Sequence, residues 1–233
     1  MTCGRHIAAL LFVSACANGS TFVVAKQGDA IIVGADSRVT LTIDYNRTQP
    51  GPDTCKIHKS AKDRYFVIAS NQFINVRTGI DFSALAKQVF EARGNPKTLA
   101  DEFEIKASAA AERILKEDSQ TTILSVVFFG YDKGPFFYSR SIRRSPVETY
   151  KQPEDCEVNC SKWVTGGYHE VIDKLAPQAF STMRLEDAIP FLITREIDAD
   201  RTGGIGLPIA LFRLDRTGEH WLSPGVCEPF SSK

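Results

Sequence analysis

Runs of apolar, β-branched and aromatic residues near the start of the chain predict two pairs of β-strands. The first pair forms a hairpin, because the turn residues Gly28-Asp29 separate two runs rich in β-branched side chains. The second pair flanks a charged turn. The polar stretch between the pairs, residues 39–53, predicts a long loop or an irregular hairpin. The strands expected here are residues 21–26, 30–35, 55–58 and 64–69.

Two helices are expected next, because apolar residues recur at helical spacing. The first covers residues 82–93, and Gly94-Asn95-Pro96 ends it. The second begins near Thr98, whose hydroxyl can cap it, and runs to about Lys116.

The rest of the chain again predicts strands, two helices and closing strands. Residues 121–129 are nearly all apolar, β-branched or aromatic, which indicates a buried central strand. Helices are expected at residues 168–176 and 185–197, and Pro190 must kink or shorten the second of them. The other strands are expected at residues 135–139, 147–150, 160–164, 207–214 and 219–222.

This order of elements predicts an α+β fold in four layers. Two stacked antiparallel sheets, each covered on its outer face by helices, would bury all of the apolar stripes. We therefore expect an αββα sandwich that forms one domain over residues 20–233.

Residues 1–19 predict a cleavable leader, either a signal peptide or a propeptide. Arg5 and His6 precede an uncharged apolar run at residues 7–17, which is too short to span a bilayer because a spanning helix needs about 20 residues. Small-residue patterns allow cleavage before Asn18 or before Ser20, and lipidation of Cys16 is a further alternative. The remaining interpretation is a folded or disordered N-terminal extension. A leader implies an exported protein that is periplasmic, secreted or lipid-anchored.

Charge and cysteine content narrow the classes of function. The 28 basic and 28 acidic residues give a formal net charge of zero, and no basic stripe favours nucleic acid binding. After removal of the leader, Cys55, Cys156, Cys160 and Cys227 can form two disulfides in three connectivities. No set of His and Cys residues accompanies them at zinc-site spacing, so we expect no metal and no cofactor. No later stretch is long and apolar enough to span a membrane.

Several motifs resemble those of proteasome β subunits, which belong to the N-terminal-nucleophile (Ntn) hydrolases. Ala35-Asp36-Ser37-Arg38 is similar to the motif that ends the second strand of those subunits. The family places its nucleophile sixteen residues before this Asp, a position that Ser20 occupies here, directly after Gly19. Later similarities, in the family's order, are Cys55-Lys56-Ile57-His58, residues 126–138, Thr202-Gly-Gly204 and Pro208-Ile209. The resemblance therefore covers almost all of the chain after the leader.

The resemblance implies that Ser20 is the nucleophile of an amide-bond hydrolase. As N-terminal residue, Ser20 would carry a free amine with an ordinary pKa of about 8, which can act as general base for its own hydroxyl. Lys56 would activate the pair electrostatically, Asp36 would hold Lys56 charged and oriented, and Arg38 would brace the loop. Were processing to leave Thr21 first, the spacing to Asp36 would be one residue short.

The chain departs from the family pattern in ways that favour a second interpretation. The family's usual nucleophile is threonine, and the loop before Lys56 is longer than in typical members. A Gly-rich turn is replaced by residues 70–73, and the family's Gly-Ser-Gly is Thr165-Gly166-Gly167. A second carboxylate of the family would fall at Ala199, so either Asp198 or Asp200 is its candidate here.

These departures leave two functions open. The first is an exported peptidase or amidohydrolase that acts through an acyl-enzyme on a small peptide or amide. The second is a catalytically inactive protein of the same fold with an assembly or binding role. Proteasome relatives form rings, so a homo-oligomer is compatible with both functions.

Overall fold

The computed structural model of the chain describes residues 20–44, 47–70, 74–75, 80–114, 122–143, 154–157 and 159–230. Over these residues the fold is α+β, with two five-stranded antiparallel sheets and four helices, as expected. The leader at residues 1–19 lies outside the described residues, as do the expected strand at 147–150 and positions 71–73 of the altered turn.

The first sheet has the strand order β12-β1-β2-β13-β14. Its strands are β1 (Thr21–Gln27), β2 (Ala30–Asp36), β12 (Lys162–Gly167), β13 (Ile209–Asp215) and β14 (Gly218–Ser223). The predicted hairpin is confirmed, since β1 pairs with β2 from Phe22 opposite Ala35 to Gln27 opposite Ala30. Gly28 supplies the positive φ angle that its turn requires.

The second sheet has the order β11-β10-β9-β6-β5. Its strands are β5 (Ile57–Ala61), β6 (Arg64–Ser70), β9 (Thr122–Tyr131), β10 (Pro135–Arg143) and β11 (Asp155–Cys156). As the sequence predicts, β9 is a central strand with buried side chains. Two small hairpins stand apart, β3 (Thr40–Asp44) with β4 (Arg47–Pro50) and β7 (Ile74–Asn75) with β8 (Ile80–Asp81). The expected irregular hairpin at residues 39–53 is therefore present as β3 and β4.

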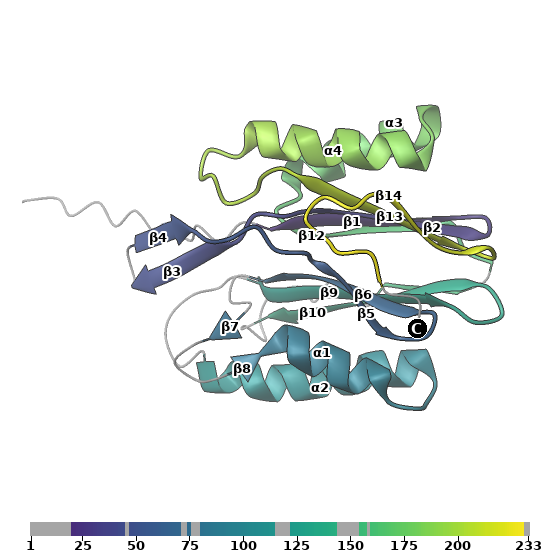
Figure 1. Cartoon of the computed structure of the whole chain (residues 1–233), viewed down its shortest axis with the longest axis horizontal. Coiled ribbons are helices and arrows are strands. Elements are labelled where there is room, and N and C mark those ends of the chain that lie inside the picture. Colours follow the sequence, from purple (N-terminus) through teal and green to yellow (C-terminus); the bar gives the residue numbers. More distant parts are fainter. Residues whose placement is uncertain are drawn as a thin grey trace, which may run out of the picture.

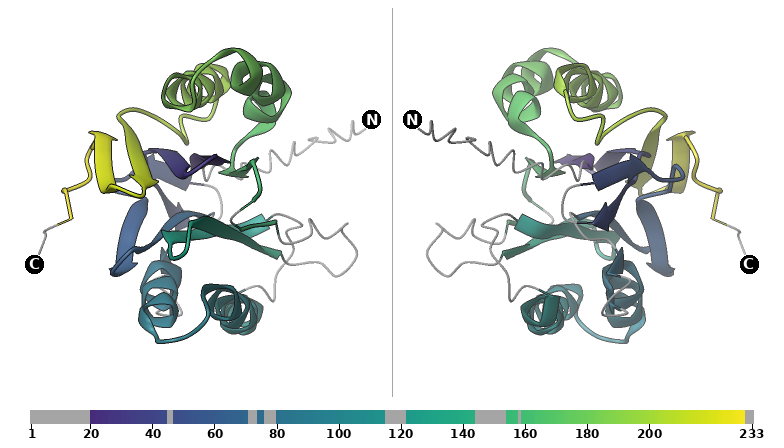
Figure 2. Two further views of the ribbon diagram at one scale, coloured as in Figure 1. Left: turned by 90° about the vertical axis from the view of Figure 1, so that its right-hand side faces the viewer. Right: turned by 90° about the vertical axis from the view of Figure 1, so that its left-hand side faces the viewer.

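Four helices cover the outer faces of the two sheets, as Figures 1 and 2 show. Helices α1 (Phe82–Glu91) and α2 (Pro96–Ile114) lie against the second sheet, and α3 (Glu170–Thr182) and α4 (Leu185–Ala199) lie against the first. A third apolar cluster, including Phe22, Val33 and Phe129, fills the space between the sheets. The layers therefore follow the order helices, sheet, sheet, helices.

The start of α2 corrects one sequence prediction. The helix begins at Pro96, and the Asn95 side chain accepts hydrogen bonds from the N–H groups of Lys97 and Thr98, at 2.9 and 3.3 Å. Thr98 was the expected cap, but it lies inside the first turn. Proline favours the first helical position because the missing N–H has no intrahelical partner there, and Asn is a strong cap just before it.

The last two helices are longer than the sequence predicts. Helix α3 begins at Glu170 and runs through Pro177 to Thr182, while α4 runs through Pro190 to Ala199. Each proline removes one backbone hydrogen bond, but both helices pack an apolar face on β1 and β2, which offsets that loss. Buried Glu196 of α4 also accepts the N–H groups of Val171 and Ile172, both at 2.9 Å, and so caps the start of α3.

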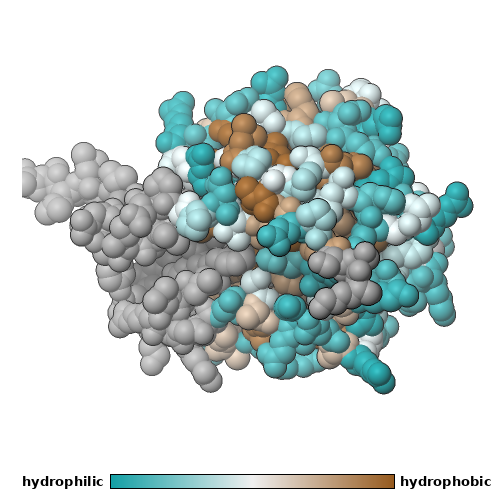
Figure 3. Space-filling view, in the orientation of Figure 1, coloured by the Kyte–Doolittle hydropathy of each residue, from teal (hydrophilic) through white to brown (hydrophobic). Residues whose placement is uncertain are grey.

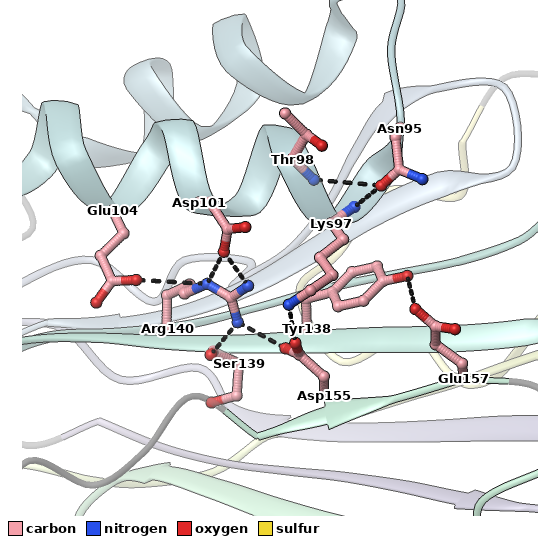
Figure 4. A network of polar contacts seen from close by, with 10 residues as sticks. All are labelled: Asn95, Lys97, Thr98, Asp101, Glu104, Tyr138, Ser139, Arg140, Asp155 and Glu157. Atoms are coloured by element: carbon pink, nitrogen blue, oxygen red, sulfur yellow. Dashed lines mark hydrogen bonds and ion pairs between the residues drawn. The ribbon is translucent and has the colours of Figure 1, made fainter.

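A buried arginine ties α2 to the second sheet (Figure 4). Arg140 of β10 is 1% exposed, and its guanidinium contacts Asp101 and Glu104 of α2 and Asp155 of β11. Lys97 also pairs with Asp155. Because three carboxylates surround one desolvated cation, α2, β10 and β11 are held together by charge as well as by apolar contact.

Two disulfides link described cysteines. Cys55 pairs with Cys227 across 172 residues, and Cys156 pairs with Cys160 across four. The sequence left three connectivities open, and this is one of them. Two disulfides are compatible with an exported protein, because disulfides persist in oxidising compartments. Among the described residues, no helix is long and apolar enough to cross a membrane.

Candidate active site

The candidate site lies where the N-terminal end of β1, the C-terminal end of β2 and the residue before β5 meet. Ser20 directly precedes β1, Asp36 is the last residue of β2, and Lys56 directly precedes β5. All three are buried, with exposed fractions of 7%, 1% and 2%. The fold thus brings together residues of both sheets that the sequence motifs single out.

A buried ion pair joins the two sheets at this point. The Lys56 ammonium lies 2.5 Å from Oδ1 of Asp36, and the same oxygen accepts the Thr21 N–H at 2.8 Å. The other oxygen, Oδ2, accepts the N–H groups of Arg38 at 3.1 Å and Gly206 at 3.2 Å. Among the described residues, every group that hydrogen-bonds to Asp36 is a donor, an arrangement that favours the ionised carboxylate.

Burial and charge act in opposite directions on this pair. Burial lowers the pKa of Lys56 below its ordinary value, and the neighbouring Asp36 opposes that shift. Burial likewise raises the pKa of Asp36, while Lys56 and the N–H groups of Thr21 and Gly206 oppose the rise. A lysine that is desolvated yet held by a carboxylate can place a concentrated positive charge beside a reacting group.

Ser20 is held through its backbone at the start of β1, an internal strand of the first sheet. Its carbonyl accepts the N–H of Tyr168 at 2.7 Å, and a Cβ atom on Gly167 would lie 1.8 Å from that oxygen. Gly167 has φ +78°, so its lack of a side chain serves both the backbone conformation and the close approach. Tyr168 and Gly167 therefore fix the strand end that carries Ser20.

Thr21 has a backbone role rather than a free hydroxyl. Its N–H donates to Asp36, and its Oγ1 donates to the Tyr168 carbonyl at 2.6 Å. In this arrangement Ser20 is the residue immediately before the one that the ion pair anchors.

The loop that carries Gly206 is organised by Asp200 and Arg38. Asp200 accepts the N–H of Thr202 at 2.8 Å and of Ile205 at 3.0 Å. Burial opposes ionisation of Asp200, but these hydrogen bonds and that of the Thr202 hydroxyl hold its pKa below the ordinary value. The Arg38 guanidinium lies against Gly206, since a Cβ atom there would be 2.5 Å from its Cζ.

Asp200 thus holds Ile205, the residue before Gly206, and the Gly206 N–H contacts Asp36. Asp198, the alternative candidate, is 58% exposed at its side chain and pairs with Arg195. Of the two candidates, Asp200 is the one that hydrogen-bonds within the loop that carries Gly206.

Thr165 points away from the ion pair. Its hydroxyl donates to Asp173 of α3 at 3.0 Å, and the other oxygen of Asp173 contacts Nδ1 of His169 at 2.8 Å. Gly166 and Gly167 carry no side chain. The hydroxyl that the family's Gly-Ser-Gly would supply is therefore not provided by these three residues.

Sequence reasoning did not find the groups that reach the site through their backbones. The N–H of Gly206 and both backbone groups of Tyr168 belong to this class. Backbone donors leave no residue-type signature, and only the run Thr202-Gly-Gly204 hinted at the loop before Gly206.

No protein-family model matches the chain, and no curated protein matches it. Within the described ranges, no group of three or more His, Cys, Asp and Glu side chains is arranged to hold a metal ion.

Proposed function

We propose that the protein is an exported amide-bond hydrolase whose mature form begins at Ser20. The observation that carries the proposal is the buried Lys56–Asp36 pair, which anchors the N–H of Thr21 immediately after that serine. Buried ionisable groups with perturbed pKa values are typical of catalytic sites, and this pair lies directly beside the chain position that the resemblance assigns to the nucleophile.

The proposed reaction uses a single residue as nucleophile and base. The Ser20 amine accepts the proton of its own hydroxyl while the oxygen attacks the substrate carbonyl, and the Lys56 ammonium stabilises the negative charge. Collapse of the tetrahedral intermediate breaks the C–N bond, and the leaving amine takes the proton, which gives an ester on Ser20. Water, deprotonated by the same amine, then attacks the ester and releases the carboxylic acid with the free serine.

The layer order supports this proposal at the level of architecture. Two antiparallel sheets between pairs of helices are what the resemblance to Ntn hydrolases implies for the chain. The two disulfides fit export, and an exported enzyme is separated from cytosolic unfolding machines. We therefore propose a small peptide or amide as substrate.

A homo-oligomer, such as a ring, is part of the same proposal. Apolar side chains gather on the upper part of the face shown in Figure 3. Exposed Leu207, Leu222 and Val226 add apolar surface around β14, the edge strand of the first sheet. Such surface is the kind that subunit contacts cover.

One observation favours the second candidate, an inactive protein of the same fold with a binding or assembly role. Residues 165–167 do not supply the hydroxyl expected near the nucleophile, because Thr165 donates to Asp173 and the next two residues are glycines. A protein that has lost the chemistry could keep the ion pair only as a structural remnant.

Acylation of the mature protein separates the two candidates. A peptide β-lactone should add to wild-type protein and not to a Ser20→Ala variant, whereas Ser181→Ala, at an exposed serine of α3, should react like the wild type. Intact-mass spectrometry reads the adduct, and release of a fluorophore from short peptide amides reads turnover. Hydrolysis that survives in Ser20→Ala would refute the proposed function. A mature protein that begins at Ser20 and forms no adduct would support the inactive candidate.

A further inference from the structure

The last described residues of the chain cross from one sheet to the other. Residues 224–230, here named the C-terminal strap, leave β14 of the first sheet and run beside the edge of the second (Figure 1). Within the strap, Cys227 is 5% exposed and forms the disulfide with Cys55, where the Cα atoms are 4.8 Å apart. The strap is therefore attached covalently to the residue that precedes Lys56.

Aromatic packing holds the strap against both sheets. The Phe230 ring lies 5.3 Å from Trp221 and 5.8 Å from Phe212, both in the first sheet. The same ring lies 5.7 Å from Tyr65 of the second sheet. Beside it, Lys59 of β5 pairs with Glu219 of β14 at 2.8 Å, so the two sheet edges are also joined directly.

Three successive residues around Lys56 are each fixed in a different way. The Thr54 N–H donates at 2.8 Å to the carbonyl of Ser37, the residue after β2, and the Lys56 carbonyl accepts the Ile68 N–H of the second sheet at 3.2 Å. Between them, Cys55 is fixed by its disulfide. Each of these hydrogen bonds contributes only about 1 kcal/mol, whereas the disulfide is a covalent link that ties the residue before Lys56 to the strap.

We propose that Cys55 and Cys227 are positioning residues, whose disulfide holds the strap closed and keeps Lys56 shielded from water against Asp36. The expected effect on catalysis rests on the proposed function, whereas the expected shielding of Lys56 does not. A dithiol reductant opens the strap by giving up two electrons and two protons. Its own thiols then form a disulfide, and Cys55 and Cys227 become thiols. Without the disulfide the backbone at Cys55 can shift, so that water reaches Lys56 and the site loses its fixed positive charge.

The chain contains a matched control for this inference. Cys156 and Cys160 form the second disulfide, which closes a loop that holds none of the three candidate residues. Replacing both cysteines of a disulfide by serine removes one disulfide from the protein, whichever of the two disulfides is chosen. The comparison of a Cys55→Ser/Cys227→Ser variant with a Cys156→Ser/Cys160→Ser variant therefore isolates the effect of the strap.

Lysine labelling tests the shielding without any need for turnover. Folded protein is treated briefly with an N-hydroxysuccinimide ester, and peptide mass spectrometry gives the rate at each lysine. We expect Lys56 to react about tenfold faster in Cys55→Ser/Cys227→Ser than in the wild type and the control variant. Buried Lys26 should stay protected in the strap variant and serves as an internal reference. Equal protection of Lys56 in both variants, or equal exposure in both, would overturn the inference.

Turnover gives the second readout. The strap variant should lose about tenfold in kcat with KM little changed, since the change affects Lys56 and not substrate binding. Brief dithiol reduction of the wild type should reproduce the loss, and reoxidation should restore it. If the strap variant does not fold, labelling is read on the reduced wild type after its folded fraction is isolated by size exclusion. A wild-type protein without any turnover counts against the proposed function. The labelling rate of Lys56 then tests by itself whether the disulfide of the strap shields that lysine.

Discussion

Replacement of Gly167 by alanine tests the geometry that holds Ser20. The new Cβ atom would lie 1.8 Å from the Ser20 carbonyl oxygen and 2.6 Å from its carbon, both of them backbone atoms. These atoms cannot turn aside as a flexible side chain would. The strand end must therefore move, and the 2.7 Å hydrogen bond from the Tyr168 N–H to the Ser20 carbonyl is the first to break.

The expected loss of stability in Gly167→Ala has two separable parts. At φ +78° a residue with a Cβ atom is strained by about 1–2 kcal/mol. Loss of the hydrogen bond leaves the Tyr168 N–H unsatisfied beside a buried strand, which costs about 1–3 kcal/mol more. We therefore expect Gly167→Ala to lower the free energy of unfolding by about 2–5 kcal/mol.

Gly203→Ala is the matched control, because Gly203 has φ +69° but no atom within 4 Å of its Cβ position. It should show only the backbone strain of about 1–2 kcal/mol. Urea unfolding at pH 7, followed by circular dichroism, measures both variants, and acylation of Ser20 should slow only in Gly167→Ala. Equal losses of stability in the two variants would refute the close contact between Gly167 and Ser20.

Two further predictions concern buried ionisable side chains. Asp36→Asn leaves Lys56 charged and unpaired in the interior, so it should lower the free energy of unfolding, measured in urea, by about 3–5 kcal/mol. Adding Lys56→Met to that variant should recover part of the loss. If the losses of the two single variants simply add in the double variant, the pairing is contradicted. Burial lowers the pKa of His58 to about 4 from an ordinary 6.5, and its Nε2 has no hydrogen-bond partner among the described residues. Between these values the unfolded chain binds a proton that the folded chain does not. Stability should therefore fall by about 3 kcal/mol as the pH drops from 6.5 to 4, and stay level below. His58→Leu should remove most of this dependence in unfolding curves taken across the range, and an unchanged slope would show that other groups cause it.

The sequence predicts the fold well where the local pattern is unambiguous. Strands β1 and β2 follow from short, nearly continuous apolar runs, and the buried face of α1 follows from apolar residues at helical spacing. Prediction from the sequence fails where tertiary contacts outweigh the local preferences of the residues. Pro177 and Pro190 do not end their helices, because packing of α3 and α4 on the first sheet offsets the lost hydrogen bonds. Strand β11 has only two residues and leaves no period to detect.

In the candidate site, too, groups within short motifs can be predicted from the sequence, whereas contacts between distant parts of the chain cannot. Asp36 and Lys56 are found from short motifs, because side-chain chemistry must come from particular residue types. Gly206 donates to Asp36 from 170 residues further along the chain, through an N–H that every residue but proline has. The partner of Cys55 could not be predicted either, since four cysteines pair in three ways and spacing alone does not choose among them.

The state of the Ser20 amine tests the central claim most directly. Protein produced from the full sequence in a secreting host is purified, denatured and treated with periodate, which cleaves the bond between an amine-bearing carbon and its neighbouring hydroxyl carbon only at an N-terminal Ser or Thr. Intact-mass spectrometry before and after treatment then identifies the first residue. A chain that begins at Ser20 and is converted to the N-terminal aldehyde is the predicted result. A periodate-resistant chain that starts at Asn18, at a lipidated Cys16 or further upstream would contradict it, because Ser20 would then have no free amine to act as base.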